Sequence, residues 1–139
     1  MKPVMDGYQF TLPFEVRDYE CDLQGIVNNA VYHQYLGHAR HRFLKSRGLD
    51  FADLTARGVR LVVVRVEIDY KASLRSGDEF VAALNAQRIS EVRFGFAQDL
   101  YRLPERTLVL KAKVICAATD EQGKPMRPTA VDALFQDAP

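Results

Sequence analysis

One long segment with helical periodicity constrains the fold of this chain more than any other feature. Between Ala30 and Arg47, apolar side chains recur at spacings of three and four residues, while the opposite side is polar and basic. Gly48 follows as a suitable C-terminal cap. The pattern therefore predicts one amphipathic helix, about 27 Å long from the rise per residue. The recurring side chains are Tyr32, Tyr35, Leu36, Ala39 and Phe43.

Most of the remaining chain has the alternating pattern of β-strands. Five segments are predicted as strands, at 10–16, 59–71, 78–89, 92–102 and 107–119. The last four are joined by short links with turn signals, which favour antiparallel neighbours. A shorter helical turn is expected over 51–56, with Asp50 as its cap. The order of elements predicts an α+β domain, in which one helix covers one antiparallel sheet.

One helix covers only one face of such a sheet, so we expect contact with another subunit. The strand over 59–71 places Val62, Val64, Val66, Ile68 and Tyr70 on one alternating face, which we expect to be dry. The sheet face away from the helix has the apolar candidates Val81, Ile89, Val109 and Ile115. An uncovered apolar face predicts a homo-oligomer.

Composition excludes several classes of protein. A chain of 139 residues with 47% hydrophobic content fits a single domain over 1–139. The formal net charge of +1 gives no general attraction to nucleic acid or to an anionic membrane, so an anion site has to be a local basic patch. No apolar run has the length of a signal peptide or of a membrane span, which predicts a cytoplasmic protein. Cys21 and Cys116 have no metal-ligand spacing, so we expect free thiols and no metal site.

Polar chemistry is concentrated just before the predicted helix, in the segment RDYECDLQGIVNNAVYHQYL. Gly25 permits a positive φ or a close backbone approach, and Asn28 or Asn29 is suited to cap the helix. Free N–H groups at a helix start can polarise a carbonyl oxygen. Asp22 adds a carboxylate that could attack or activate water, which makes a minimal acyl-transfer site. The alternative is that Asp22 forms a structural Asx turn.

The segment ECDLQGIVNNAVYHQYLGHARHRFL resembles the signature of hotdog-fold acyl-CoA thioesterases, specifically the 4-hydroxybenzoyl-CoA thioesterase family and its relatives associated with the Tol-Pal system. VEIDYKASLRSGDEF resembles the second strand and following loop of that family, and EQGKPMRPT resembles its final turn. The likeness spans nearly the whole chain. The positions that match the signature are Asp22, Gly25, Ile26, Val27 and Tyr32.

The resemblance implies a hotdog fold, a curved antiparallel five-stranded sheet wrapped around one long helix. It implies dimers or tetramers, with a homotetramer expected here, and active sites at subunit interfaces. In such enzymes the residue matching Asp22 is the nucleophile or general base on a thioester, and the backbone N–H of Asn29 polarises the carbonyl. No metal or cofactor is implied. The implied substrate-binding positions are Gly25, Val27, Tyr32 and Arg127, the last toward the nucleotide of CoA.

The function expected from this resemblance is hydrolysis of an acyl-CoA thioester to a carboxylate and free CoA. Many members have His in place of Asn29, so a non-catalytic protein that binds acyl thioesters or acts in assembly is one alternative. The motif VNNAVY is nearer to a branch acting on acyl carrier protein, which is another. The acyl group is left open, because pocket depth depends on a neighbouring subunit and on the side chains of Leu61, Val63, Phe94 and Phe96.

Several other residues near the motif have competing interpretations. Cys21 could be a nucleophile with His33 or His38 as its base, but we favour a small apolar filler. Tyr32 and Tyr35 are expected to fill the core, with the hydroxyl of one lining an acyl pocket as the alternative. The histidines on the polar helix side are expected to be solvated or in subunit contacts, and they are His33, His38 and His41.

Overall fold

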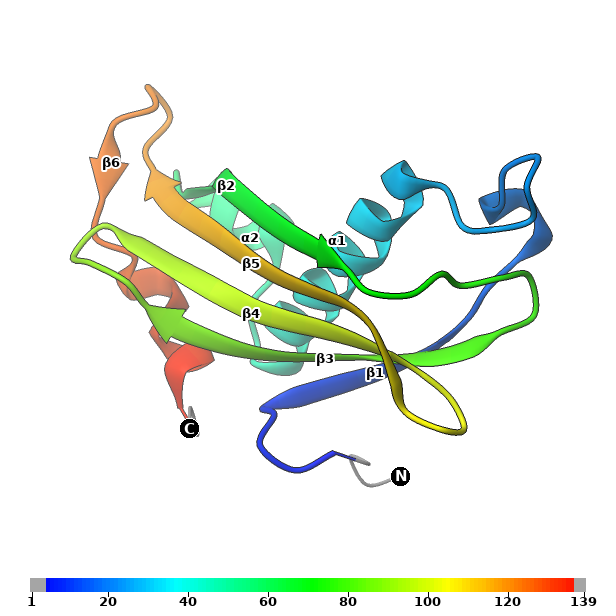
Figure 1. Ribbon diagram of the computed structural model, residues 1–139. Helices are drawn as coiled ribbons and strands as arrows, with labels where there is room; N and C mark the ends of the chain where they lie inside the picture. Colours follow the sequence, from blue (N-terminus) through cyan, green and yellow to red (C-terminus); the bar gives the residue numbers. More distant parts are fainter. Residues whose placement is uncertain (1–4, 137–139) are drawn as a thin grey trace.

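A long helix, α1 (Asn29–Ser46), lies against one face of an antiparallel sheet in the computed structural model, which describes residues 5–136 (Figure 1). The sheet has the strand order β1-β3-β4-β5-β2, and β6 pairs with β5 off that path. The strands are β1 (Phe10–Glu15), β2 (Arg60–Tyr70), β3 (Glu79–Arg88), β4 (Arg93–Arg102), β5 (Thr107–Thr119) and β6 (Pro125–Met126). The shorter helices are α2 (Phe51–Ala56), η1 (Asp18–Glu20) and η2 (Thr129–Phe135). The predicted class and element order are confirmed, with β6 as a sixth strand that was not predicted.

The helix forms where the sequence predicted it because its apolar face is buried and its start is capped. The five recurring apolar side chains of that face are all buried. Asn28 is the cap, since its side chain accepts a hydrogen bond from the Ala30 N–H at 2.9 Å. The helix therefore begins at Asn29, one residue earlier than expected. Within residues 5–136 no helix combines the length and apolar character that crossing a membrane requires.

An aromatic cluster fixes α1 on the sheet. Phe80 of β3 is fully buried, and its ring stacks on Phe14 of β1 with the centroids 4.9 Å apart. The ring of Tyr35 from α1 lies 4.8 Å from the same Phe80 ring. Buried aromatic side chains contribute large apolar areas and favour defined ring geometries. The cluster therefore holds the first turns of α1 at one end of the sheet.

The prediction that one alternating face of β2 is apolar and buried is wrong. The register against β5 shifts between Val63 and Arg65, a β-bulge that breaks the strict alternation. Val63 and Val66 pair with the buried Cys116 and Val114, so both lie on the helix side, and Val62 faces the other way. β2 is also an edge strand with β5 alone beside it. Apolar β2 side chains consequently stay exposed, with fractions of 39% for Val62, 44% for Val64, 38% for Val66 and 46% for Tyr70.

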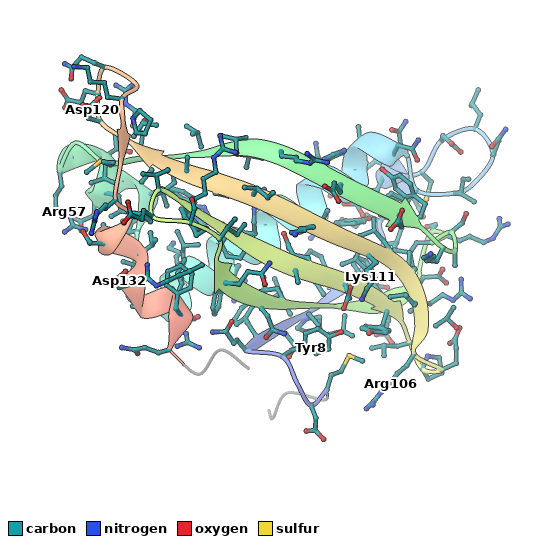
Figure 2. All side chains as sticks on the ribbon, turned by 60° about the vertical axis from the view of Figure 1, so that its left-hand side comes forward. Tyr8, Arg57, Arg106, Lys111, Asp120 and Asp132 are labelled. Atoms are coloured by element: carbon teal, nitrogen blue, oxygen red, sulfur yellow. The ribbon has the colours of Figure 1, made fainter. Side chains whose placement is uncertain are left out.

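The sheet face away from α1 is also less apolar than the sequence suggested. Val81 and Val109, two of its four candidates, are buried within the chain itself. The face instead carries a polar network, in which Tyr8 donates to Asp99 at 2.5 Å and Lys111 lies 3.3 Å from the same carboxylate (Figure 2). Ile89, a third candidate, is 41% exposed, so this face is only partly apolar. More of the exposed apolar side chains lie along the β2 edge, which is the better candidate for contact with another subunit.

Candidate functional site

The loop before α1 holds Asp22 in a defined turn. The Asp22 N–H donates to the Ile26 carbonyl at 2.9 Å, and the Gly25 N–H donates to the Asp22 carbonyl at 3.0 Å. Gly25 has a φ of 80°, a left-handed conformation that favours glycine. Oδ1 of Asp22 accepts the Gln24 N–H at 2.9 Å, so the Asx turn is present. The turn uses only Oδ1 of this exposed carboxylate. Residues 5–136 provide no hydrogen-bond donor to the other oxygen, Oδ2.

Backbone pairing attaches this loop to the connection between β2 and β3. The Val27 N–H donates to the Leu74 carbonyl at 2.9 Å, and Ile26 forms an isolated bridge with Arg75. The Leu74 N–H in turn donates to the hydroxyl oxygen of Tyr32 at 3.1 Å. Val27 and Tyr32 are buried, so they support the loop from below. The expectation that Tyr32 fills the core is confirmed.

The start of α1 presents a free donor beside the loop. The Ala30 N–H is taken by the Asn28 side chain, and the Val31 N–H donates to the Asn28 carbonyl at 2.9 Å. No acceptor for the Asn29 N–H lies within residues 5–136. This N–H is at the positive end of an 18-residue helix. Its position suits polarisation of a carbonyl oxygen placed next to the Asp22 loop.

Glu20 is a carboxylate near the loop that sequence reasoning missed. Its Oε1 accepts the Tyr35 hydroxyl at 2.8 Å and the Arg17 N–H at 2.8 Å. Burial and the Glu20 carboxylate raise the pKa of Tyr35 well above its usual value near 10. The pair joins the loop to the second turn of α1. Glu20 has no periodic or motif signal in the sequence, so only the folded arrangement identifies it.

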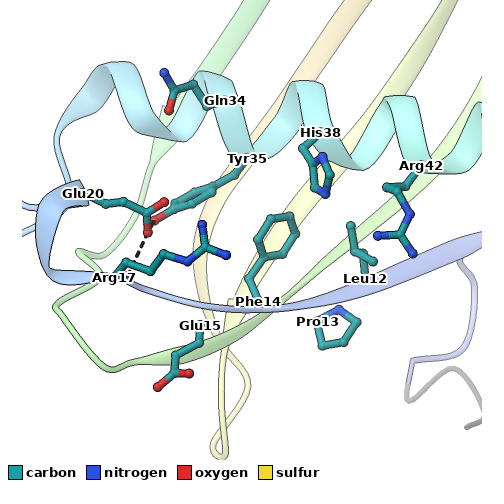
Figure 3. Close-up of a pocket in the computed structure, with 10 residues that line it drawn as sticks. All are labelled: Leu12, Pro13, Phe14, Glu15, Arg17, Glu20, Gln34, Tyr35, His38 and Arg42. Carbon is teal, nitrogen blue, oxygen red and sulfur yellow. Dashed lines mark hydrogen bonds between the residues drawn. The ribbon is translucent and has the colours of Figure 1, made fainter.

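A groove runs between β1 and the outer side of α1 (Figure 3). Its volume is about 470 Å³, and Tyr35 with Glu20 closes one end. His38, exposed as expected from its place on the polar helix side, packs edge-on against Phe14 with ring centroids 5.9 Å apart. Asp22 does not line this groove. The groove is therefore separate from the loop site.

A second, mostly apolar pocket of about 90 Å³ lies on the other side of α1, beside the β2 edge. We call it the β2-side pocket. Its walls include all four side chains from which an acyl pocket was expected. Burial raises the pKa of the Cys116 thiol in its wall to about 11, so this thiol is neutral at physiological pH. The lining residues are Gly37, Arg40, Leu44, Phe51, Leu61, Val62, Val63, Phe94, Phe96 and Cys116.

Arg127 lies far from the loop in the same chain. Its guanidinium Nη2 is 3.3 Å from Oε1 of Glu91, next to the turn between β3 and β4. The Asp22 loop adjoins the opposite end of β3, on the right in Figure 1, while β6 is on the left. The ten residues of β3 span about 30 Å. One chain therefore brings together every predicted site residue except Arg127.

Within residues 5–136, Cys21 makes no hydrogen bond to a histidine. Among residues 5–136 no three His, Cys, Asp or Glu side chains are grouped to hold a metal ion. Cys21 is half-buried and packs against the main core. This placement agrees with the apolar filler that we favoured.

Comparison with known proteins places this geometry in a family. A chloroplastic acyl-acyl carrier protein thioesterase of Arabidopsis thaliana is 36% identical over 122 residues, 87% of this chain and 64% of the plant protein. The chain thus spans less than two thirds of that relative. The structure of a 1,4-dihydroxy-2-naphthoyl-CoA thioesterase from Synechocystis matches with a TM-score of 0.87 at 21% identity, covering 92% of this chain and 96% of that one. A Staphylococcus aureus protein in complex with CoA matches with a TM-score of 0.84 at 18% identity, covering 99% and 90%.

The sequence pattern of the Thioesterase-like superfamily matches residues 16–138. The chain belongs to this superfamily, and its curved sheet around one long helix is the hotdog fold. The match includes the Asp22 loop, α1 and all of the sheet except β1.

The Tyr35–Glu20 pair predicts a specific alkaline instability. Because the folded state raises the pKa of Tyr35, the stabilisation from its neutral phenol is complete below pH 10 and is lost as the pH rises above that value. We expect the free energy of unfolding in urea to fall between pH 9 and pH 11, and to fall less in Tyr35→Phe. The exposed Tyr19 gives a control, since Tyr19→Phe should keep the wild-type pH dependence. Equal pH dependence of Tyr35→Phe and the wild type would contradict this assignment.

Proposed function

We propose that this protein is a thioester hydrolase that converts acyl-CoA to a carboxylate and free CoA. The observation that carries the proposal is that one short loop ends in an unpaired Asn29 N–H at the start of α1 and also holds the exposed Asp22 carboxylate. The family membership and the Arabidopsis relative, which is named as a thioesterase, support the reaction class.

The two groups divide the chemistry between them. The Asn29 N–H donates to the thioester carbonyl oxygen, where negative charge develops during attack. Asp22 either attacks the carbonyl carbon itself or takes a proton from the water that attacks. If Asp22 attacks, the carbon–sulfur bond breaks to give CoA thiolate and an anhydride between the acyl group and Asp22, and water then hydrolyses that anhydride to the free carboxylate and Asp22. If Asp22 activates water, the water oxygen adds to the carbonyl carbon and the carbon–sulfur bond breaks directly to carboxylate and CoA thiolate. In both routes the thiolate takes up a proton after it leaves. The Asn29 side chain can donate hydrogen bonds but has no titratable proton to transfer as a general acid, and a thiolate leaves without strong acid assistance.

We further propose that two copies complete the site across the β2 edge. The exposed valines of β2 and an unpaired strand edge favour pairing with another chain. A two-fold axis perpendicular to the sheet would align two β2 strands antiparallel and keep both helices on one face. The ring of Tyr70, at the C-terminal end of β2, lies 5.6 Å from the ring of Tyr32 near the Asp22 loop. The pairing would thus set the Asp22 loop of one copy beside the β2-side pocket of the other.

This arrangement gives Arg127 a role that one chain alone does not allow. Antiparallel pairing moves the β6 end of one copy toward the Asp22 loop of the other. Arg127 of the second copy would then lie on the side where the nucleotide of CoA leaves the active site. Leu23 and Tyr19, with exposed fractions of 107% and 76%, are apolar side chains near the loop that such a contact would cover. A homotetramer remains the expected larger assembly.

Two other functions are alternatives to acyl-CoA hydrolysis. The Arabidopsis relative is named for acyl-acyl carrier protein, and the phosphopantetheine arm of that carrier presents the same thioester as CoA. A non-catalytic acyl-thioester-binding or assembly protein is the second alternative, because Asn29 stands where many relatives have His. The narrower resemblance to 4-hydroxybenzoyl-CoA and Tol-Pal-associated thioesterases, and a cytoplasmic location, remain predictions.

The replacement Asp22→Asn tests the proposed reaction. The amide keeps the shape and can accept the Gln24 N–H, but it has no negative charge. We expect kcat to fall about a hundredfold to ten-thousandfold with little change in KM, measured as thiol release from short, medium, long and aromatic acyl-CoAs. Asp120 provides a matched control, because it also accepts a backbone N–H two residues on, that of Gln122 at 2.9 Å.

Asp120→Asn should retain wild-type turnover. If folded Asp22→Asn keeps more than about a tenth of the wild-type kcat, Asp22 does not carry the reaction. Loss of even a modest general base lowers kcat by more than that. If the wild type binds these thioesters but releases no thiol, the binding-protein alternative replaces the enzyme.

The oligomer proposal predicts a mass of at least twice the 15.8 kDa of one chain at micromolar concentration. Val66→Lys places a charge among the exposed apolar side chains of β2 and should shift the assembly toward the monomer. Sedimentation equilibrium measures both, and Lys113→Ala on the polar sheet face is the control expected to leave the mass unchanged. A wild-type protein that sediments only as a single chain would remove the shared site.

A further inference from the structure

Arg40 is a half-buried cation with no carboxylate beside it. Its Nη1 donates to Oε1 of Gln98 at 3.0 Å, and Nε2 of the buried Gln98 donates to the Leu36 carbonyl at 3.1 Å. Among residues 5–136 no Asp or Glu oxygen lies within 4.0 Å of the guanidinium. Burial lowers the pKa of Arg40, although an arginine stays charged in proteins. One neutral amide does not compensate the positive charge of Arg40. The bond to Gln98 fixes the guanidinium, and its other N–H groups are available to a ligand.

The helix leaves open space next to this cation. Gly37 lies in the interior of α1, where glycine is less favourable than almost any other residue. A Cβ at this position would be 3.6 Å from Nη2 of Arg40, which is ordinary contact distance. Position 37 could therefore carry a side chain that packs against the guanidinium, and it carries none. Gly37 and Arg40 both line the β2-side pocket.

The rest of that pocket is apolar. Leu44, Phe94 and Phe96 contribute hydrocarbon walls, and the neutral Cys116 thiol lies among them. Its volume within one chain is about 90 Å³. An occupant that satisfies these walls has an apolar body and an acceptor oxygen that meets the guanidinium.

We propose that Arg40 is a specificity-determining residue that binds an acceptor oxygen on the acyl group of the substrate, away from the thioester. The inference rests on the proposed function, in which this pocket faces the Asp22 loop of a second copy. The chemical class is an acyl thioester whose acyl group carries a carboxylate, a phenolic oxygen or an oxo group. A guanidinium binds each of these by charge-assisted hydrogen bonds, and most strongly when the oxygen is anionic.

Matched pairs of thioesters identify the oxygen. The pairs are adipoyl-CoA with hexanoyl-CoA, 4-hydroxybenzoyl-CoA with benzoyl-CoA, and acetoacetyl-CoA with butanoyl-CoA. We expect the wild type to prefer the oxygenated member of at least one pair by about tenfold to a hundredfold in kcat/KM, as a hydrogen bond to a charged group allows. Arg40→Gln should remove that preference by lowering kcat/KM for the oxygenated member about tenfold to a hundredfold more than for the hydrocarbon member.

Two variants at position 37 separate recognition from folding. Gly37→Glu places a carboxylate one turn before Arg40 and should abolish the preference, while the better helix former raises Tm. Gly37→Ala improves the helix in the same way but adds no charge, so it should keep the preference. A lost preference in Gly37→Glu therefore cannot be attributed to a weakened fold.

The proposal is wrong if the wild type shows no preference in any pair, or if Arg40→Gln lowers kcat/KM equally for both members. Either result leaves hydrolysis through Asp22 intact. If no thioester is hydrolysed, the proposed function fails, and calorimetry with the same pairs then tests Arg40 by itself. Tighter binding of an oxygenated member, lost in Arg40→Gln, supports the assignment, and equal affinities within all pairs reject it.

Discussion

The packing of α1 against the sheet is the interaction on which the candidate site depends. Phe80, Phe14 and Tyr35 form one aromatic cluster that fixes the first half of the helix. The helix start is then held beside Leu74, whose N–H and carbonyl bind Tyr32 and the loop residue Val27. The free Asn29 N–H and the Asp22 loop lie at the same end of the sheet because Val27 and Tyr32 fix both of them to Leu74. A shift of the helix along the sheet would separate them.

The two edges of α1 face different surroundings, and this difference suggests how the protein distributes its function. Toward β1 the helix borders a polar groove closed by its own Tyr35 and Glu20. Toward β2 it borders an apolar pocket beside an unpaired strand edge, with the Arg40 guanidinium in its wall. A second copy paired at that edge would bring the Asp22 carboxylate of one chain to the pocket of the other, and would bring Arg127 toward the partner's loop, beside the Arg75 that adjoins this loop.

Local pattern was sufficient to predict the class, the helix and the succession of the main strands along the chain, because each depends on periodicity within one segment. The expectation that the short link makes β2 and β3 neighbours was wrong, since β2 pairs with β5 at the edge of the sheet. The bulge after Val63 was not predictable, since one extra residue leaves an alternating pattern looking intact while it turns side chains to the other face. The pairs Arg40–Gln98 and Glu20–Tyr35 join residues distant in the sequence. The loop motif located Asp22 and Gly25, but their hydrogen bonds required the folded chain.

The most direct test of the shared site is a mixed dimer of two defective copies. One copy carries Asp22→Asn, the other carries Gly37→Trp to fill the pocket, and two different tags isolate the mixed species. If Asp22 of one copy acts on a substrate held in the pocket of the other, one of the two sites is intact, and the mixed dimer has about half of the wild-type activity. If each chain uses its own loop with its own pocket, both sites are defective, and activity no higher than that of the parent variants would contradict the account.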